Sequence, residues 1–134
     1  MENLMANYLK RSFVCDMLRV SQWQSYHVVG SSYGPRISSD DVLAVLNRAR
    51  RGGLEPLSYP GLPHDLLTPE ELSAELAESD ISVRELLNWT RRTKPGAIPP
   101  HFHITRRTIR FPRAEFMAWL DARSRLKSLK VRKA

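Results

Sequence analysis

Residues 98–120, IPPHFHITRRTIRFPRAEFMAWL, constrain the fold of this chain more than any other stretch. Apolar and polar residues alternate over residues 101–104 and again over residues 108–111, which is typical of two half-buried strands. Arg106 and Arg107 separate the two strands within a polar turn. The pattern predicts an antiparallel hairpin with both arginines pointing outward at its tip, where a phosphate backbone can meet them. Its inward-facing residues would be Phe102, Ile104, Ile109 and Phe111.

A helix is predicted to begin directly after this hairpin. Pro112 suits the first turn of a helix, because an N–H is not needed there, and Glu115 lies near the positive end. Three apolar residues follow at helical spacing: Phe116, Trp119 and Leu120. The helix can therefore close a small apolar core.

Two capping boxes precede the hairpin, at Thr68–Glu71 and at Ser82–Glu85. In a capping box the hydroxyl accepts from the backbone N–H three residues on, and the glutamate side chain accepts from the first residue's N–H. The two boxes predict a helix, a short turn and a second helix. Arg84, Asn88, Arg91 and Arg92 would lie away from the apolar stripe of the second helix.

The first half of the chain repeats this order of elements. Ser21–Gln24 is a third capping box after a short apolar helix, and residues 39–41 start a closing amphipathic helix. Residues 30–37 stand where a hairpin would be, but they are too few for two strands. We therefore predict an internal repeat of architecture rather than of sequence. Residues 50–65 hold three Gly and three Pro and lack helical periodicity, so they predict a linker between the halves.

Basic residues are concentrated in the second half. The chain has a net charge of +7, yet 14 Lys and Arg and only three acidic residues lie from Arg84 onward. Such a block indicates a polyanion as partner, and a merely soluble basic surface is the alternative.

Several classes of function are disfavoured. The single Cys15 sits among apolar residues, which favours a buried structural thiol in a reducing compartment. No apolar run reaches the roughly 18 residues of a membrane span, and no secretory signal pattern is present. No nucleophile–base pair, glycine-rich phosphate loop or perturbed carboxylate pair suggests an enzyme, so we expect no catalysis and no cofactor. The alternating His101 and His103 lack further ligands nearby, so no metal is expected. The three tryptophans, Trp23, Trp89 and Trp119, are interpreted as core residues.

Four segments in the second half resemble the winged helix-turn-helix of the excisionase and MerR-like superfamily: LTPEEL, SVRELLNW, ITRRTIRFPR and EFMAWL. The resemblance covers residues 66–123. YLKRSFVCDMLRVSQ and PRISSDDVLAVL resemble a second copy at 8–50. Residues 90–100 insert a longer Pro/Gly segment than the family pattern, and the first copy has almost no wing. The long C-terminal coiled coil of effector-sensing members is missing, so a small-molecule or metal sensor is not favoured.

The resemblance implies a mostly α fold with a small β-hairpin wing, arranged as a tandem winged helix-turn-helix. The expected division is a wing-reduced domain at 1–50, a linker at 51–65, a winged domain at 66–123 and a basic tail at 124–134. It also implies binding of double-stranded DNA, with the second helix of each unit in the major groove. In the second unit, Arg84 and Asn88 would meet base edges, and Arg91 and Arg92 would meet phosphates. Arg106 and Arg107 would contact the minor groove or its phosphates, with Arg110 on the outward face of the wing strand. In the first unit, the reading positions would be Gln22, Gln24 and His27, although the capping box can occupy Gln24.

Small basic proteins of this resemblance act as excisionases, also called recombination directionality factors, which bend DNA at attachment sites. We expect this role, with a small transcriptional regulator of mobile elements as the alternative. A further alternative is an adaptor whose first domain binds an integrase, another protein or a second copy of the chain. The expected location is the cytoplasm, in association with the nucleoid.

Overall fold

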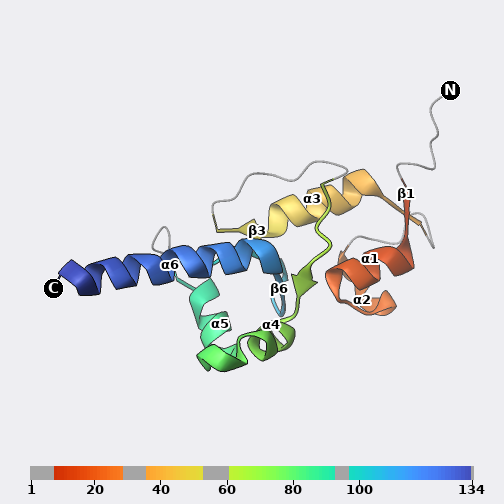
Figure 1. Ribbon diagram of the computed structural model, residues 1–134. Coiled ribbons are helices and arrows are strands. Elements are labelled where there is room, and N and C mark those ends of the chain that lie inside the picture. The colour runs from red at the N-terminus through yellow and green to blue at the C-terminus, as the bar shows by residue number, and fades with distance from the viewer. Residues whose placement is uncertain (1–7, 29–35, 53–60, 93–96, 134) are drawn as a thin grey trace.

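The computed structural model describes residues 8–28, 36–52, 61–92 and 97–133, except for the side chains of Gln22 and of residues 124–133. The elements of the first half are β1 (Tyr8–Lys10), α1 (Arg11–Leu18), α2 (Gln22–Val28), β2 (Arg36–Ser38), α3 (Ser39–Ala49) and β3 (Arg50–Arg51). Those of the second half are β4 (Leu66–Leu67), α4 (Pro69–Glu75), the 3-10 turn η2 (Ala77–Ser79), α5 (Val83–Thr90), β5 (His101–Thr105), β6 (Thr108–Pro112) and α6 (Arg113–Lys133). The end of α6 extends beyond the rest of the molecule (Figure 1).

Two antiparallel sheets accompany the helices. β1 pairs with β2 in a small sheet, and a larger sheet has the strand order β3-β5-β6-β4. The hairpin β5–β6 forms the middle of the larger sheet, with Arg106 and Arg107 as its turn. The fold is therefore mixed, with helices around two sheets, and the expectation of a mostly α chain with one small wing is confirmed only in part.

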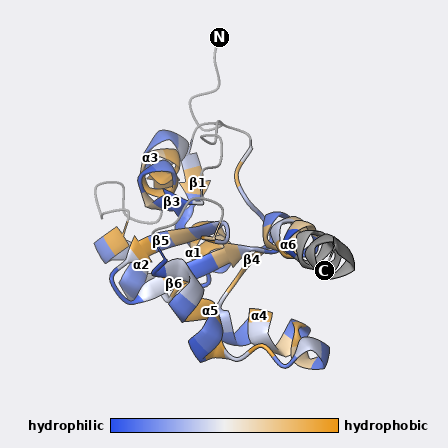
Figure 2. Ribbon diagram, turned by 90° about the vertical axis from the view of Figure 1, so that its left-hand side faces the viewer, coloured by the Kyte–Doolittle hydropathy of each residue, from blue (hydrophilic) through white to orange (hydrophobic). Residues whose placement is uncertain are grey.

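The hairpin has an apolar core on each of its faces. Figure 2 shows the hairpin and the elements around it, coloured by hydropathy. Phe102 pairs with Arg110 and His103 with Ile109, so the alternation of each strand sends Phe102 and Phe111 to opposite faces. Phe102 and the partly buried Ile104 belong to the core of the first half, with residues such as Leu18. Phe111 and Ile109 belong to the core of the second half. The prediction of one inward face was therefore wrong, because both faces of the hairpin are covered.

The core of the first half includes residues from both predicted domains. Val14, Leu46 and Ile37 are buried there together with Leu66 and Phe102. β3, at the end of the first half, also pairs with β5, with Arg50 opposite Phe102. The division at 51–65 stays a prediction, but described residues on either side of it share a sheet and a core.

The core of the second half is closed by α6, as predicted. Leu72, Leu86, Phe111 and Phe116 are fully buried in it. Trp89 and Trp119 pack against it as expected, with ring centroids 5.7 Å apart. Burying aromatic side chains of this size contributes a large share of the apolar stabilisation in a small unit.

The helix starts follow the predicted caps closely. Both capping boxes at Thr68–Glu71 and Ser82–Glu85 are formed, and so are the two reciprocal bonds of Ser21 and Gln24. The start of α3 is displaced by one residue, because Ser38 is the N-cap and accepts from the Asp40 N–H. α6 begins at Arg113, after Pro112, and Asp65 caps it from a distance. The Asp65 backbone carbonyl accepts from the Arg113 N–H at 3.1 Å, and its carboxylate accepts from the Ala114 N–H at 2.8 Å.

A residue in the left-handed conformation separates the helices of each pair. Arg19 has φ 57° after α1, and Asp80 has φ 55° after η2. Each is followed two residues later by the serine that caps the next helix. The two halves therefore share the form of the turn between their helices, and the repeat of architecture stays a prediction.

Two further expectations concern Cys15 and the membrane. Cys15 is a buried free thiol, as predicted. No helix within the described ranges is long and apolar enough to cross a lipid bilayer. Residues 30–35, where a reduced wing was predicted, lie outside the described residues, and Arg36–Ser38 pair with β1.

Candidate nucleic-acid interface

α5 and the two residues after it present three of the four predicted DNA-contacting side chains to solvent. Arg84, Asn88 and Arg91 are exposed, while the half-buried Arg92 guanidinium lies over the Trp89 ring at 5.6 Å. The orientation of α5 follows from two neighbours in sequence. The Ser82 hydroxyl caps the Glu85 N–H at 3.2 Å, and Leu86 is fully buried, so the opposite face of this short helix points outward. The three ion pairs among the described residues do not include these arginines.

The tip of the hairpin carries two exposed guanidinium groups. Arg106 and Arg107 form the turn between Thr105 and Thr108, as predicted. Neither Arg106 nor Arg107 has a positive φ. The turn is therefore not of type I′ or II′, the types favoured in two-residue hairpins. A register shift between His103 and Thr105 accompanies this turn. Both guanidinium groups lie at the surface, and neither belongs to the three ion pairs among the described residues.

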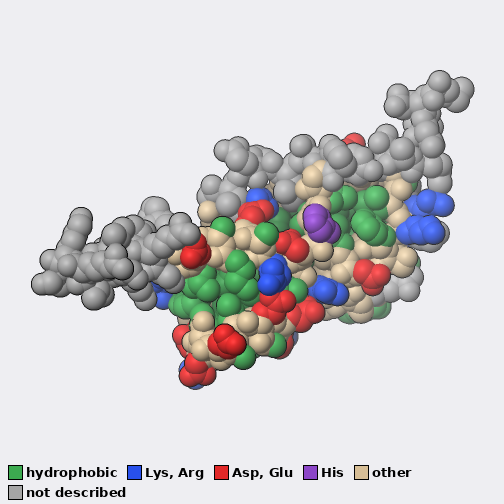
Figure 3. All heavy atoms as spheres, in the orientation of Figure 1, with side chains coloured by type: hydrophobic (Ala, Val, Ile, Leu, Met, Phe, Trp, Pro, Cys, Tyr) green, Lys and Arg blue, Asp and Glu red, His purple; other side chains and the backbone are tan. Residues whose placement is uncertain are grey.

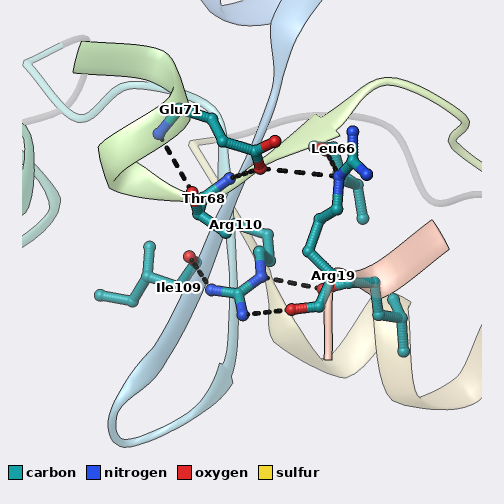
Figure 4. Close-up of polar contacts among 7 residues, drawn as sticks. Arg19, Leu66, Thr68, Glu71, Ile109 and Arg110 are labelled. Atoms are coloured by element: carbon teal, nitrogen blue, oxygen red, sulfur yellow. Dashed lines mark hydrogen bonds and ion pairs between the residues drawn. The ribbon is translucent and has the colours of Figure 1, made fainter. Parts of the chain in front are cut away.

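Arg110 does not lie on an outward face, contrary to the prediction. Its Nε donates to the Leu18 carbonyl at 2.8 Å and its Nη2 to the Arg19 carbonyl at 2.7 Å (Figure 4). Its Nη1 donates to the Ile109 carbonyl at 2.9 Å. The guanidinium therefore binds carbonyls at the end of α1, which the helix leaves without partners. Burial lowers the pKa of Arg110, while Glu70 and Glu71 act the other way. This side chain joins the two halves and is withdrawn from the predicted interface.

Arg19 makes the reciprocal contact from the first half. Its Nε donates to the Leu66 carbonyl at 3.3 Å and lies 3.6 Å from a Glu71 carboxylate oxygen (Figure 4). The pKa of Glu71 is lowered, first by the hydrogen bond from the Thr68 backbone N–H, and Arg19 adds to this effect. We call Arg19, Glu71 and Arg110 the arginine clasp. Because the clasp uses backbone carbonyls of both halves, it sets how they are oriented.

A second polar contact between the halves involves β3, which lies at the other edge of the larger sheet from β4. Arg50 of β3 donates through Nη2 to both carboxylate oxygens of Glu115, at 2.9 and 3.1 Å. The Arg50 guanidinium also lies over the Phe102 ring at 5.1 Å. Glu115 was expected near the positive end of α6, where it is found, but its partner comes from outside the predicted domain.

α2 places its two described reading candidates at the surface. Gln24 and His27 are exposed, but the Gln24 side-chain oxygen already accepts from the Ser21 N–H at 2.9 Å. The side chain of Gln22 lies outside the described residues. Trp23 was predicted to lie in the core, yet it is 71% exposed, with its ring 4.3 Å from that of His27. The prediction failed because α2 turns Ser25, not Trp23, toward α1, where Arg11 donates to the Ser25 hydroxyl at 3.0 Å.

The hairpin tip lies beside α2, at a cleft of about 200 Å³. The α2 side of the cleft includes Trp23, Gln24 and His27, and Thr105 and Thr108 line it from the hairpin. The wing predicted for the second unit therefore flanks the second helix of the first unit. Sequence patterns give no sign of this pairing, since it depends on which half covers which face of the hairpin.

The opposite charge gathers elsewhere on the molecule. Figure 3 shows acidic side chains collected over α4 on one face, where Glu70, Glu71, Glu75 and Glu78 belong to α4 and η2. A polyanion would be repelled from this face. Among the described side chains, no group of three or more His, Cys, Asp or Glu could hold a metal ion.

No protein-family model, curated protein or solved structure matches this chain.

Proposed function

We propose that the protein binds double-stranded DNA through two helix-turn-helix units, as an excisionase-like recombination directionality factor of a mobile element. The observation that carries this proposal is the shared form of the two helix pairs. Each has a left-handed turn residue and a serine-capped second helix with an exposed outer face. An exposed second helix after such a turn is the arrangement with which helix-turn-helix proteins enter the major groove.

Charge supports DNA as the partner. Arg84 on α5, Arg91 at its C-cap, and Arg106 and Arg107 on the hairpin are exposed and take no part in the described ion pairs. Cations of this kind are attracted to phosphates, with an affinity that falls steeply as salt rises. Arg84 and Asn88 also carry the side chains that recognise guanine and adenine edges.

The arginine clasp favours an architectural role within this proposal. Two reading helices held in one orientation fix the path of the DNA between their sites, and DNA that must follow a set path bends at a cost that depends on its sequence. A rigid pair of units therefore suits a protein that shapes an attachment site. An integrase or another recombinase would be the partner that uses the bent DNA.

The test begins with selection of duplexes from a fragment library of the source genome, at two salt concentrations. Footprinting and a bending assay follow on the selected site. We expect a discrete site that the protein still binds at higher salt and bends on binding. The bound protein should change the direction of an integrase reaction. Weak binding to all fragments that disappears with salt would contradict specific recognition.

A transcriptional regulator is the second candidate, and the position of the selected site beside a promoter rather than an attachment site would favour it.

The adaptor hypothesis gains support from the exposed Trp23, since tryptophan is enriched where proteins meet. Deleting the first half would not separate these candidates, because Leu66 and Phe102 would lose their core. Point variants on α2 and α5 are the appropriate tools.

A further inference from the structure

Trp23 and Arg84 occupy the same place in the two helix pairs. Each lies two residues after the serine that caps its helix, Ser21 or Ser82. Each is also exposed on the outer face of that helix. Arg84 is the predicted base-edge contact of the second unit, so the first unit presents an indole where the second presents a guanidinium.

The same correspondence holds one helical turn later. His27 lies four residues after Trp23, and Asn88 lies four residues after Arg84. The Trp23 and His27 rings contact each other edge to face, with centroids 4.3 Å apart. α2 therefore offers an aromatic surface, while α5 offers side chains that form hydrogen bonds. The two surfaces cannot read the same chemical groups.

The cleft beside Trp23 has no acidic residue in its lining, and Arg106 and Arg107 lie in the chain between two of its lining threonines. The cleft is lined by Val28 and by Thr105 and Thr108. Arg106 and Arg107 complete the turn between these two threonines and are exposed. A partner that combines a negatively charged backbone with apolar groups that reach an indole would suit these side chains. In duplex DNA the thymine C5-methyl groups are the apolar groups that project into the major groove.

We propose that Trp23, supported by His27, determines specificity in the first unit by contacting thymine methyl groups in the major groove. Arg106 and Arg107, contributed by the second unit, hold the adjacent phosphates. This inference rests on the proposed binding of duplex DNA and adds which bases the first unit recognises. The chain would then read purine edges with α5 and thymine methyl groups with α2.

The test uses duplexes that the 134-residue chain selects from a random-sequence library. Each thymine of the selected site is replaced in turn by deoxyuridine, which lacks only the methyl group. Binding is measured by fluorescence anisotropy at fixed salt. We expect the wild-type protein to bind about fourfold more weakly for each contacted methyl group removed. The sensitive positions should be few and adjacent.

The variant Trp23→Ala should bind the unmodified site more weakly and should no longer distinguish thymine from deoxyuridine. Because Trp23 is 71% exposed, its thermal unfolding should match that of the wild type. The matched control is Arg84→Ala at the corresponding position of α5. That variant should lose affinity but keep the full ratio between thymine and deoxyuridine duplexes.

Several outcomes would overturn the inference. One is equal binding of the wild-type protein to every deoxyuridine duplex, and another is a Trp23→Ala variant that keeps the discrimination. Unchanged DNA affinity of Trp23→Ala would also overturn it and would favour the adaptor hypothesis for the exposed indole. All three leave DNA binding itself intact. Failure of the wild-type protein to retain any specific duplex would instead remove the proposed function together with this inference.

Discussion

At the scale of the residue, Arg110 contributes to folding rather than to binding. Arg110→Met leaves the Leu18 and Arg19 carbonyls without their donor. Hydrogen bonds to charged groups contribute more than neutral ones, so we expect the free energy of unfolding to fall by about 2–4 kcal/mol. Urea denaturation measures this change. The matched control is Arg107→Met, which removes an exposed arginine three positions earlier and should alter stability by less than about 0.5 kcal/mol. Equal effects of the two variants would contradict the clasp.

His101 makes stability depend on pH. Burial lowers the pKa of this fully buried histidine, and the nearby His103 and Arg51 lower it further, although the bond of Nδ1 to the Pro99 carbonyl at 2.9 Å opposes this. The unfolded chain then binds more protons than the folded one, between the lowered pKa and the ordinary value of about 6.5. The free energy of unfolding that the neutral, buried His101 contributes is therefore fully present above about pH 6.5, and it is lost as the pH falls toward the lowered pKa. Unfolding of the wild type and of His101→Gln, measured between pH 7.5 and 5.5, should show a smaller loss in the variant.

At the scale of the element, the start of α5 depends on one hydroxyl. Ser82→Ala removes the acceptor of the Glu85 N–H and should lower the free energy of unfolding by about 1 kcal/mol. Ser79→Ala is the control, because Ser79 is exposed in η2 and forms no cap. Chemical denaturation of both variants decides the matter. A cost for Ser79→Ala as large as that for Ser82→Ala would show that the cap has no special role.

The sequence predicts such elements well where the signal is local. Capping boxes at Ser21, Thr68 and Ser82 involve residues three apart, and the hairpin turn at Arg106 and Arg107 lies within one polar stretch, so short patterns are sufficient. Alternation along β5 and β6 distinguishes two faces of each strand, but it does not show what covers either face. That is why Phe102 and Phe111 were assigned to one face although they are buried in different cores. The predicted position of Arg110 was wrong because contacts between the halves determine it. The predicted position of Trp23 was wrong because the contact of Arg11 with Ser25 determines which face of α2 is buried.

At the scale of the whole molecule, the two halves should fold together. A fragment of residues 61–134 leaves Leu66 and Phe102 without most of their core and deprives Arg110 of two acceptors. We expect this fragment to lack a cooperative thermal transition, whereas the full chain shows one. Circular dichroism and limited proteolysis test this expectation. A fragment that unfolds cooperatively at the temperature of the full chain would restore the predicted division into independent domains.

The hairpin between the two cores also limits how such a gene can change. Proteins built from separable modules evolve by exchange, since a module carries its own interior with it. Here Phe102 serves one interior and Phe111 the other, on strands of a single hairpin. Neither half can be transferred to another protein with its packing complete. A substitution in either strand of the hairpin can disturb the packing of both cores. The pair is therefore expected to be inherited as one unit, even though its two halves follow the same plan.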